Sequence, residues 1–232
     1  AFIDDDAYPD IHWIEYAVKY FSSEKIGSVG GPGITPPASG YMSYLGGRVY
    51  ENILVSGNYR YRYKAGGVRR DVDDYPSCNL FVAKDVLVAI DGYRTDFWPG
   101  EDTLLCKSIV DAGFRIVYDP WGIVYHHRRA LFAPHLRQLG RYAFHRGYFC
   151  KKYPSNSLRL SYFIPTLFVV YLLSWLPMSW LPMSCISAVP CSVASYIING
   201  YLLLLPFYAA LVLLTTFSFN PVSWILTAFG VA

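Results

Sequence analysis

The sequence predicts an α/β domain that is followed by a basic helix and then by apolar helices. Short apolar segments alternate with helix-like segments over residues 1–127, which is the pattern of an α/β layer domain. Residues 160–232 contain no Asp, Glu, Lys or Arg, and much of the 53% hydrophobic composition lies there. We therefore divide the chain into residues 1–127, 128–159 and 160–232.

Hydrophobic periodicity, together with the Gly and Pro residues that interrupt it, locates the strands and helices of residues 1–127. The predicted strands are AFI at 1–3, IGSVGG at 26–31, CNLFVA at 78–83, RIVYDP at 115–120 and GIVYHH at 122–127. The predicted helices follow Pro9 and Asp10, cover KDVLVAI at 84–90, and cover EDTLLCKSIVDAG at 101–113. The stretch YENILVSGNYRYRYKAGG at 50–67 cannot be assigned.

The first helix shows apolar residues at helical spacing. Ile11, Ile14, Val18 and Phe21 recur in this way, and Gly27 is expected to end the helix.

Charge divides the chain differently from hydrophobicity. Residues 1–119 carry 12 basic and 17 acidic side chains, whereas residues 120–159 carry eight basic and no acidic ones. Cations mixed with Leu, Tyr and Phe over 128–159 are typical of a helix lying on an anionic membrane surface. A basic surface helix of a soluble protein and a nucleic-acid site are the alternatives. The apolar segment that follows favours membrane lipids, so we expect no nucleic-acid partner.

The uncharged segment has room for two membrane-spanning helices and part of a third, because one span needs about 20 residues. We expect them near 161–181, 185–217 and from 221 onward. The cations before the first span place the α/β domain on the cytoplasmic side. The sequence therefore predicts a multi-pass protein of the cell (inner or plasma) membrane.

Cysteine usage and the amino end add two expectations. The five cysteines form no CxxC pair and no zinc-like spacing, so we interpret them as small buried hydrophobes in a reducing compartment. The chain opens inside a predicted strand without an initiator Met, so we expect an upstream part.

Two acidic motifs are candidate sites. Asp4 and Asp6 follow a strand at its carboxyl end, where open α/β sheets bind ligands, and their oxygens suit Mg²⁺ or Mn²⁺. An acidic turn before a helix is the alternative. Glu101 and Asp102 lie at a helix start, where exposed N–H groups and the helix dipole favour anions; stabilisation of the helix alone is again the alternative.

Six segments resemble, in order, the second half of the catalytic domain of family 2 glycosyltransferases, which are membrane-associated GT-A enzymes. They are FIDDDAYP, GGPGITPP, SCNLFVAKDVLVAIDGY, WPGEDTLLCKSIVDAGFRIVYDP, GIVYHHRR and QLGRY. The resemblance covers nearly all of residues 1–150. It implies a partial GT-A domain without its N-terminal half, which alone would be inactive. It also implies a nucleotide-sugar donor and a lipid-linked or glycan acceptor, in the synthesis of exopolysaccharide or cell-envelope glycans.

The same resemblance assigns the chemical roles. Asp4 and Asp6 match the DxD motif that holds Mg²⁺ or Mn²⁺ against the donor diphosphate, and Asp102, with Glu101 beside it, matches the base that deprotonates the acceptor hydroxyl. A metal ion neutralises charge on the leaving diphosphate while the acceptor attacks the opposite face, so the anomeric centre inverts.

Binding roles follow from the remaining motifs. Gln138, Arg141 and Tyr142 match QxxRW, with Tyr in place of Trp, which argues against processive addition; a plain polar helix face is the alternative. His127 and Arg128, in the HHRR segment, are assigned to phosphate or lipid head-group contact. The residues assigned to the acceptor side are Gly31, Pro32 and Asn79.

Two other functions remain open. A metal-dependent phosphohydrolase would use the three aspartates with His126 and His127, and would release phosphate without an acceptor. A non-catalytic membrane scaffold derived from a glycosyltransferase is the other, and the intact acidic pairs argue against it.

Overall fold

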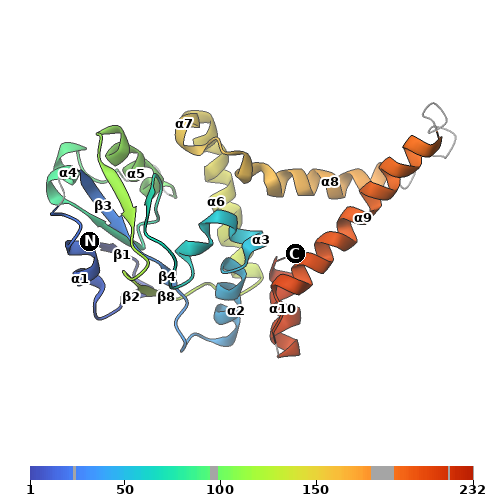
Figure 1. Ribbon diagram of the computed structural model, residues 1–232, viewed down its shortest axis with the longest axis horizontal. Coiled ribbons are helices and arrows are strands. Elements are labelled where there is room, and N and C mark those ends of the chain that lie inside the picture. Colours follow the sequence, from blue (N-terminus) through green and yellow to red (C-terminus); the bar gives the residue numbers. More distant parts are fainter. Residues whose placement is uncertain (23–24, 95–98, 179–190, 219, 232) are drawn as a thin grey trace. The chain divides into compact units, whose positions relative to one another are not determined.

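The computed structural model describes residues 1–22, 25–94, 99–178, 191–218 and 220–231 (Figure 1). The chain forms two compact units. One, called the α/β unit below, comprises Ala1–Tyr148 and Thr215–Ala232; the second unit comprises Phe149–Leu214.

The α/β unit is built on a five-stranded mixed sheet with the order β1-β6-β3-β7-β5. Its strands are β1 (Phe2–Ile3), β3 (Ile26–Gly30), β5 (Arg70–Val72), β6 (Asn79–Val82) and β7 (Arg115–Tyr118). The pair β3–β7 is parallel, whereas β1–β6, β3–β6 and β5–β7 are antiparallel. A smaller sheet has the order β2-β8-β4, from β2 (Ala7–Pro9), β8 (Val124–His126) and β4 (Gly33–Ile34).

Helices cover both faces of the larger sheet. On one face, α4 (Lys84–Ala89) and α5 (Glu101–Asp111) pack on side chains that include Leu80, Ile116 and Tyr118. On the other face, α1 (Trp13–Val18) packs on residues that include Phe81 and Val117 (Figure 1). Successive residues of one strand, such as Leu80 and Phe81, therefore pack against helices on opposite faces of the sheet, because side chains alternate along a strand.

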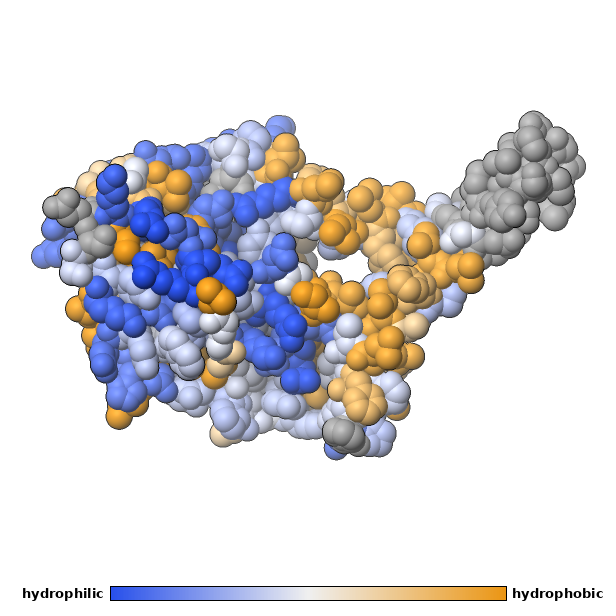
Figure 2. Space-filling model, in the orientation of Figure 1, coloured by the Kyte–Doolittle hydropathy of each residue, from blue (hydrophilic) through white to orange (hydrophobic). Residues whose placement is uncertain are grey.

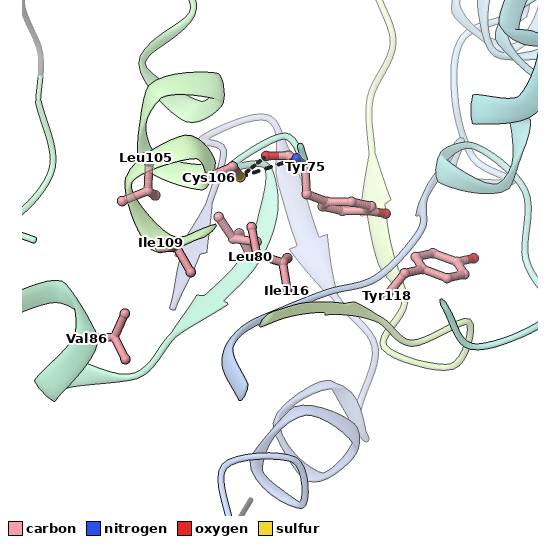
Figure 3. Close-up of a cluster of buried hydrophobic side chains, with 8 residues drawn as sticks. All are labelled: Tyr75, Leu80, Val86, Leu105, Cys106, Ile109, Ile116 and Tyr118. Atoms are coloured by element: carbon pink, nitrogen blue, oxygen red, sulfur yellow. Dashed lines mark hydrogen bonds between the residues drawn. The ribbon is translucent and has the colours of Figure 1, made fainter. Parts of the chain in front are cut away.

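Figure 3 shows how α5 is fastened to the sheet. Ile109 points from α5 toward the strand residues, Cys106 points toward Tyr75, and Leu105 belongs to the same buried cluster. The Cys106 thiol also donates to the Tyr75 carbonyl (3.4 Å) and accepts from the Tyr75 N–H (3.3 Å). The helix that begins with Glu101 is therefore fixed by both apolar packing and hydrogen bonding.

The stretch that the sequence left unassigned is helical. It contains the end of α2 (Tyr41–Tyr50), then α3 (Ile53–Ser56) and the 3₁₀ turn η1 (Gly57–Arg62). The last helix, α10 (Pro221–Val231), packs against α2: a Cβ on Gly230 would lie 2.7 Å from both Val49 and Leu131 side chains. The α/β unit is therefore completed by residues distant in sequence.

The first helix buries a face other than the predicted one. Ile11, Ile14 and Val18 are exposed, whereas Trp13 and Ala17 are buried. Trp13 is buried because its ring packs on Phe81 and its Nε1 donates to the Asn79 side chain. Gly27 does not end this helix, because it lies inside β3.

The prediction of membrane-spanning helices is wrong for the part of the chain that the structure describes. No helix there is both long and apolar enough to cross a bilayer. Helix α8 (Ile164–Met178) has 15 residues, about 22 Å of helix against a hydrocarbon core of about 30 Å. In α9 (Cys191–Thr215) side chains are described only at 200 and 203–215, which are fewer residues than a membrane span needs. Residues 179–190, which include the end of the first predicted span and the start of the second, lie outside the described residues.

This finding also corrects the predicted fold class and the predicted multi-pass location in the cell membrane. The fold is mixed α/β, with two small sheets and surrounding helices. The basic segment does form a helix, α6 (Ala133–Lys152), but its expected placement on a membrane depended on the spans. The connecting elements α7 (Pro154–Ser157) and η2 (Leu160–Phe163) are short. Exposed apolar side chains are nevertheless frequent on α8 and α9, coloured orange in Figure 2.

Candidate functional site

The three aspartates form a tight turn between two edge strands. The Ala7 N–H donates to the Asp4 carbonyl at 3.2 Å, which closes the turn. The antiparallel register of β1 and β6 pairs Phe2 with Leu80 and Ile3 with Asn79. One step further, this register sets Asp4 opposite Cys78.

The second sheet brings a histidine to the same turn. The register of β2 and β8 pairs Ala7 with His126, and the His127 N–H donates to the Asp6 carbonyl at 2.9 Å. The His126 Nε2 lies 2.9 Å from Asp6 Oδ1 and 3.7 Å from Asp4 Oδ2. The two carboxylates therefore converge on one imidazole nitrogen.

Hydrogen bonding determines which nitrogen of His126 carries the proton. Arg128 Nη1 lies 3.1 Å from Nδ1, and a guanidinium can only donate, so Nδ1 accepts and Nε2–H donates to Asp6. Burial, followed by the charge of Arg128, lowers the pKa of His126 to about 4. The imidazole is therefore neutral at pH 7 and orients the Asp6 carboxylate.

His127, the histidine assigned to phosphate contact, has a different environment. Its ring lies 6.0 Å from the ring of Tyr8, measured between centroids. Side chains alternate along an extended segment, so His126 is the member of the pair that faces the aspartates.

Asp102 and Glu101 begin α5 and accept bonds from nearby backbone groups. The Thr103 N–H donates to Asp102 Oδ1 at 2.7 Å, and the Gly100 N–H donates to Glu101 Oε2 at 2.8 Å. Loss of water around its carboxyl, followed by the charge of Asp74, raises the pKa of Asp102 to about 7. This is the range that suits a general base at neutral pH. Trp98, in the same sequence motif, lies outside the described residues.

Asp4 and Asp102 act on the same neighbours although 97 residues separate them. Both carboxylates contribute to raising the pKa of the Cys78 thiol and that of the Tyr142 phenol, for which burial is the main cause. Glu101 likewise acts on the carboxyl groups of both aspartates. The turn and the start of α5 therefore form one electrostatic cluster, which we call the carboxylate cluster: Asp4, Asp6, Glu101 and Asp102.

Two arginines border the carboxylate cluster. Arg129 Nη2 lies 3.4 Å from Asp6 Oδ2. Arg128 donates to the Gly33 carbonyl, and its guanidinium carbon lies 5.5 and 5.2 Å from the ring centroids of Tyr50 and Tyr63. Contacts with aromatic faces favour the planar cation and hold it in place.

The residues of the QxxRY motif lie on α6. Gln138 Nε2 donates to the Tyr142 hydroxyl at 3.2 Å. The charges of Asp102 and Asp4 act on the same hydroxyl and help to raise its pKa. Arg141 is exposed. Arg146, on the same helix, lies 3.7 Å from Asp74 Oδ2 and also acts on Asp102.

The loop assigned to the acceptor is tightly packed. A Cβ on Gly31 would lie 1.9 Å from the Gly122 carbonyl oxygen, so no side chain fits there. Asn79 Nδ2 donates to the carbonyls of Pro32 (3.1 Å) and Gly122 (2.7 Å), and its Oδ1 accepts from Trp13. Asn79 is thus buried as the support of this loop.

Sequence reasoning missed a buried pair next to Asp102. Asp74 is 4% exposed; its carbonyl accepts from Arg62 Nη2, which lies 3.9 Å from Asp74 Oδ2. In the sequence, Asp74 ends the acidic run DVDD, which is indistinguishable from a solvated turn. Cys78 was missed because its partners become visible only through strand register.

Asp4 and Asp6 are suited to a divalent cation. Burial, then the charges of Asp6 and Asp5, raise the pKa of Asp4, so a cation would relieve their repulsion. Both side chains are partly exposed, at 42% and 27%, which leaves room for the water and phosphate oxygens that complete a Mg²⁺ shell.

Comparison with protein-family models finds no match for this chain, and comparison with curated proteins finds none either.

Proposed function

We propose that the protein is an inverting, metal-dependent glycosyltransferase that moves a sugar from a nucleotide-sugar donor to a hydroxyl of a glycan or lipid-linked acceptor. The observation that carries the proposal is the carboxylate cluster. It joins a partly exposed aspartate pair to Asp102, whose pKa is raised to about 7. The ordered motifs that resemble family 2 glycosyltransferases support the same reading.

Asp102 accepts the proton of the acceptor hydroxyl as that oxygen attacks the anomeric carbon. A carboxylate with a pKa near 7 is ionised in about half of the molecules at neutral pH and binds a proton strongly enough to assist the attack. Thr103 holds one of its oxygens, which leaves the other for the hydroxyl.

Charge near the aspartate pair favours departure of the nucleoside diphosphate. A bound Mg²⁺ or Mn²⁺ would neutralise the negative charge that develops on the leaving diphosphate. Asp4 and Asp6 would hold that ion, and His126 fixes the direction of Asp6. Arg129, next to Asp6, supplies additional donors for phosphate oxygens, and Arg128, which is held by His126 and Gly33, adds positive charge.

Transfer from labelled nucleotide sugars by the full-length protein tests this proposal. Asp102→Asn keeps the shape but cannot accept the proton, so we expect transfer to fall about 10²- to 10⁴-fold. Asp111→Asn is the matched control, because Asp111 ends the same helix and pairs with Lys107 near the surface. Equal transfer by the wild type and Asp102→Asn would refute the role of Asp102.

A metal-dependent phosphohydrolase is a second candidate, which the 2.9 Å contact between His126 and Asp6 favours. This function predicts phosphate release from a phosphate ester without a sugar acceptor, and a strong loss of release in His126→Ala. Donor turnover that requires an acceptor hydroxyl would exclude it.

A further inference from the structure

Three chemically different ligands meet beside the acidic turn. One ligand atom each from the Asp4 carboxylate, the Cys78 thiol and the His126 imidazole lies within 4.8 Å of the other two. The Cys78 side chain is buried, that of His126 is 13% exposed and that of Asp4 is 42% exposed. The group is therefore enclosed on the protein side and reached by solvent past Asp4.

Backbone pairing, rather than chance side-chain placement, brings these ligands together. Asp4 directly follows β1 and Cys78 directly precedes β6, so the antiparallel pairing of these two strands, continued by one position, sets the two residues opposite each other. His126 arrives through β8, whose register with β2 places it beside the same turn. The three are distant in sequence, so no short spacing motif reveals them.

The donor set differs from one suited to Mg²⁺. Magnesium prefers oxygen ligands, whereas a thiolate with an imidazole and a carboxylate favours Zn²⁺ and similar ions. We propose that Asp4, Cys78 and His126 form a site for Zn²⁺ or a similar thiophilic divalent ion, with a fourth position open to water. Bonds of about 2.0–2.3 Å separate tetrahedral ligands by roughly 3.5 Å, so the side chains close by about 1 Å on binding.

Binding changes two protonation sites. The Cys78 thiol releases its proton to solvent as Sγ binds the ion. His126 binds through Nε2, which faces Asp4, and stays neutral because its hydrogen moves to Nδ1. In the metal-free structure Arg128 Nη1 donates to Nδ1. When the ion binds, Nδ1 carries the hydrogen and can no longer accept, so Arg128 Nη1 turns away.

The site has a consequence for activity that rests on the proposed function. Asp4 belongs both to this site and to the pair proposed to hold Mg²⁺ or Mn²⁺ for the donor. Zn²⁺ therefore competes with that ion, and low concentrations of Zn²⁺ inhibit transfer. The binding itself does not depend on the proposed function.

Titration of the metal-free, full-length protein with Co²⁺ tests the site, because a cobalt–thiolate bond gives a charge-transfer band in the near ultraviolet. We expect the band in the wild type and in the control Cys150→Ser, which changes a thiol that donates a hydrogen bond to the Ser157 carbonyl. Cys78→Ser abolishes it, and His126→Ala weakens Co²⁺ binding at least about tenfold. Absence of the band in the wild type, its retention in Cys78→Ser, or an unchanged Co²⁺ affinity in His126→Ala would overturn the proposal.

Transfer assays separate this inference from the proposed function. Zn²⁺ inhibits the wild type, while Cys78→Ser is inhibited at least about tenfold less strongly, each relative to its own zinc-free rate. The band without any transfer would remove the proposed function and leave the metal site. Transfer without the band would do the reverse.

Discussion

At the scale of single residues, the chemistry of the site depends on environment more than on residue type. Asp102 and Asp111 lie on one helix, yet burial and Asp74 raise the pKa of Asp102 to about 7 while Asp111 forms a surface pair. His126 and His127 are adjacent, yet strand alternation brings His126 to the aspartates. The sequence identified the acidic pairs but could not distinguish these environments.

The raised pKa of Asp102 predicts opposite pH effects on activity and stability. Transfer needs the ionised base, so kcat/KM should rise through about pH 7. The folded state holds the proton more strongly than the unfolded state between the ordinary pKa of 3.8 and about 7, so Asp102 lowers stability as pH rises through that window.

Asp102→Asn should therefore be more stable than the wild type at pH 8, by on the order of 1–3 kcal/mol, and should approach it at pH 4. Urea unfolding at the two pH values measures the difference. A variant that is less stable at pH 8 would contradict the assigned pKa direction.

Gly31 is a position where one methyl group should matter. Gly31→Ala places Cβ against the Gly122 carbonyl oxygen, and we expect a loss of about 1–3 kcal/mol or more. Gly140→Ala is the control: no atom lies within 4 Å of its added Cβ, and the change should stabilise α6 by about 0.5–1 kcal/mol. Thermal unfolding of both variants distinguishes crowding at Gly31 from a general effect of alanine.

At the scale of elements, period and punctuation in the sequence located most strands and helices of the α/β unit. The predicted strand 78–83 contains β6, and the predicted helix 101–113 contains α5. The apolar pattern gave the wrong buried face where tertiary packing determines it. Helix α1 buries Trp13 instead of Ile14, because the indole N–H of Trp13 donates to the buried Asn79 side chain. The pattern failed again at 160–232, where lack of charge was interpreted as membrane spans and no described helix meets that requirement.

The buried face of α5 should determine whether Asp102 is held in place. Ile109→Ala removes a fully buried side chain that packs on the sheet, and we expect a cost of about 2–5 kcal/mol. Val110→Ala, at a neighbouring residue that is 40% exposed, should cost less than about 1 kcal/mol. Urea unfolding measures both, and equal losses would show that α5 does not dock by this face.

At the scale of the whole molecule, the α/β unit is discontinuous in sequence. Thr215–Ala232 belongs to it, and α10 contributes Thr227, Ala228 and Val231 to its interior. Asn52 Nδ2 donates to the Thr215 hydroxyl at 3.1 Å, which fixes the point where the chain returns. Residues 149–214 therefore constitute an insertion into the α/β unit. Such closure between distant segments leaves no local signal in the sequence.

A charge at the α10 contact tests this closure. Ala228→Asp buries a carboxylate at a position that is 8% exposed, and we expect unfolding of the α/β unit roughly 5–10 °C below the wild type. Val222→Asp, on the exposed side of α10, should leave the midpoint nearly unchanged. Identical midpoints for the two variants would show that α10 does not stabilise the unit.

The late return of the chain also constrains its synthesis. Residues 1–148 leave the ribosome first, but the surface of α2 that receives α10 stays uncovered until residues 221–231 have emerged. Domains generally acquire their structure as units during translation, so the part that bears Asp4 and Asp102 matures only after the intervening segment has been made. A ribosome stalled before codon 221 should thus display a nascent chain that proteases cleave readily within α2.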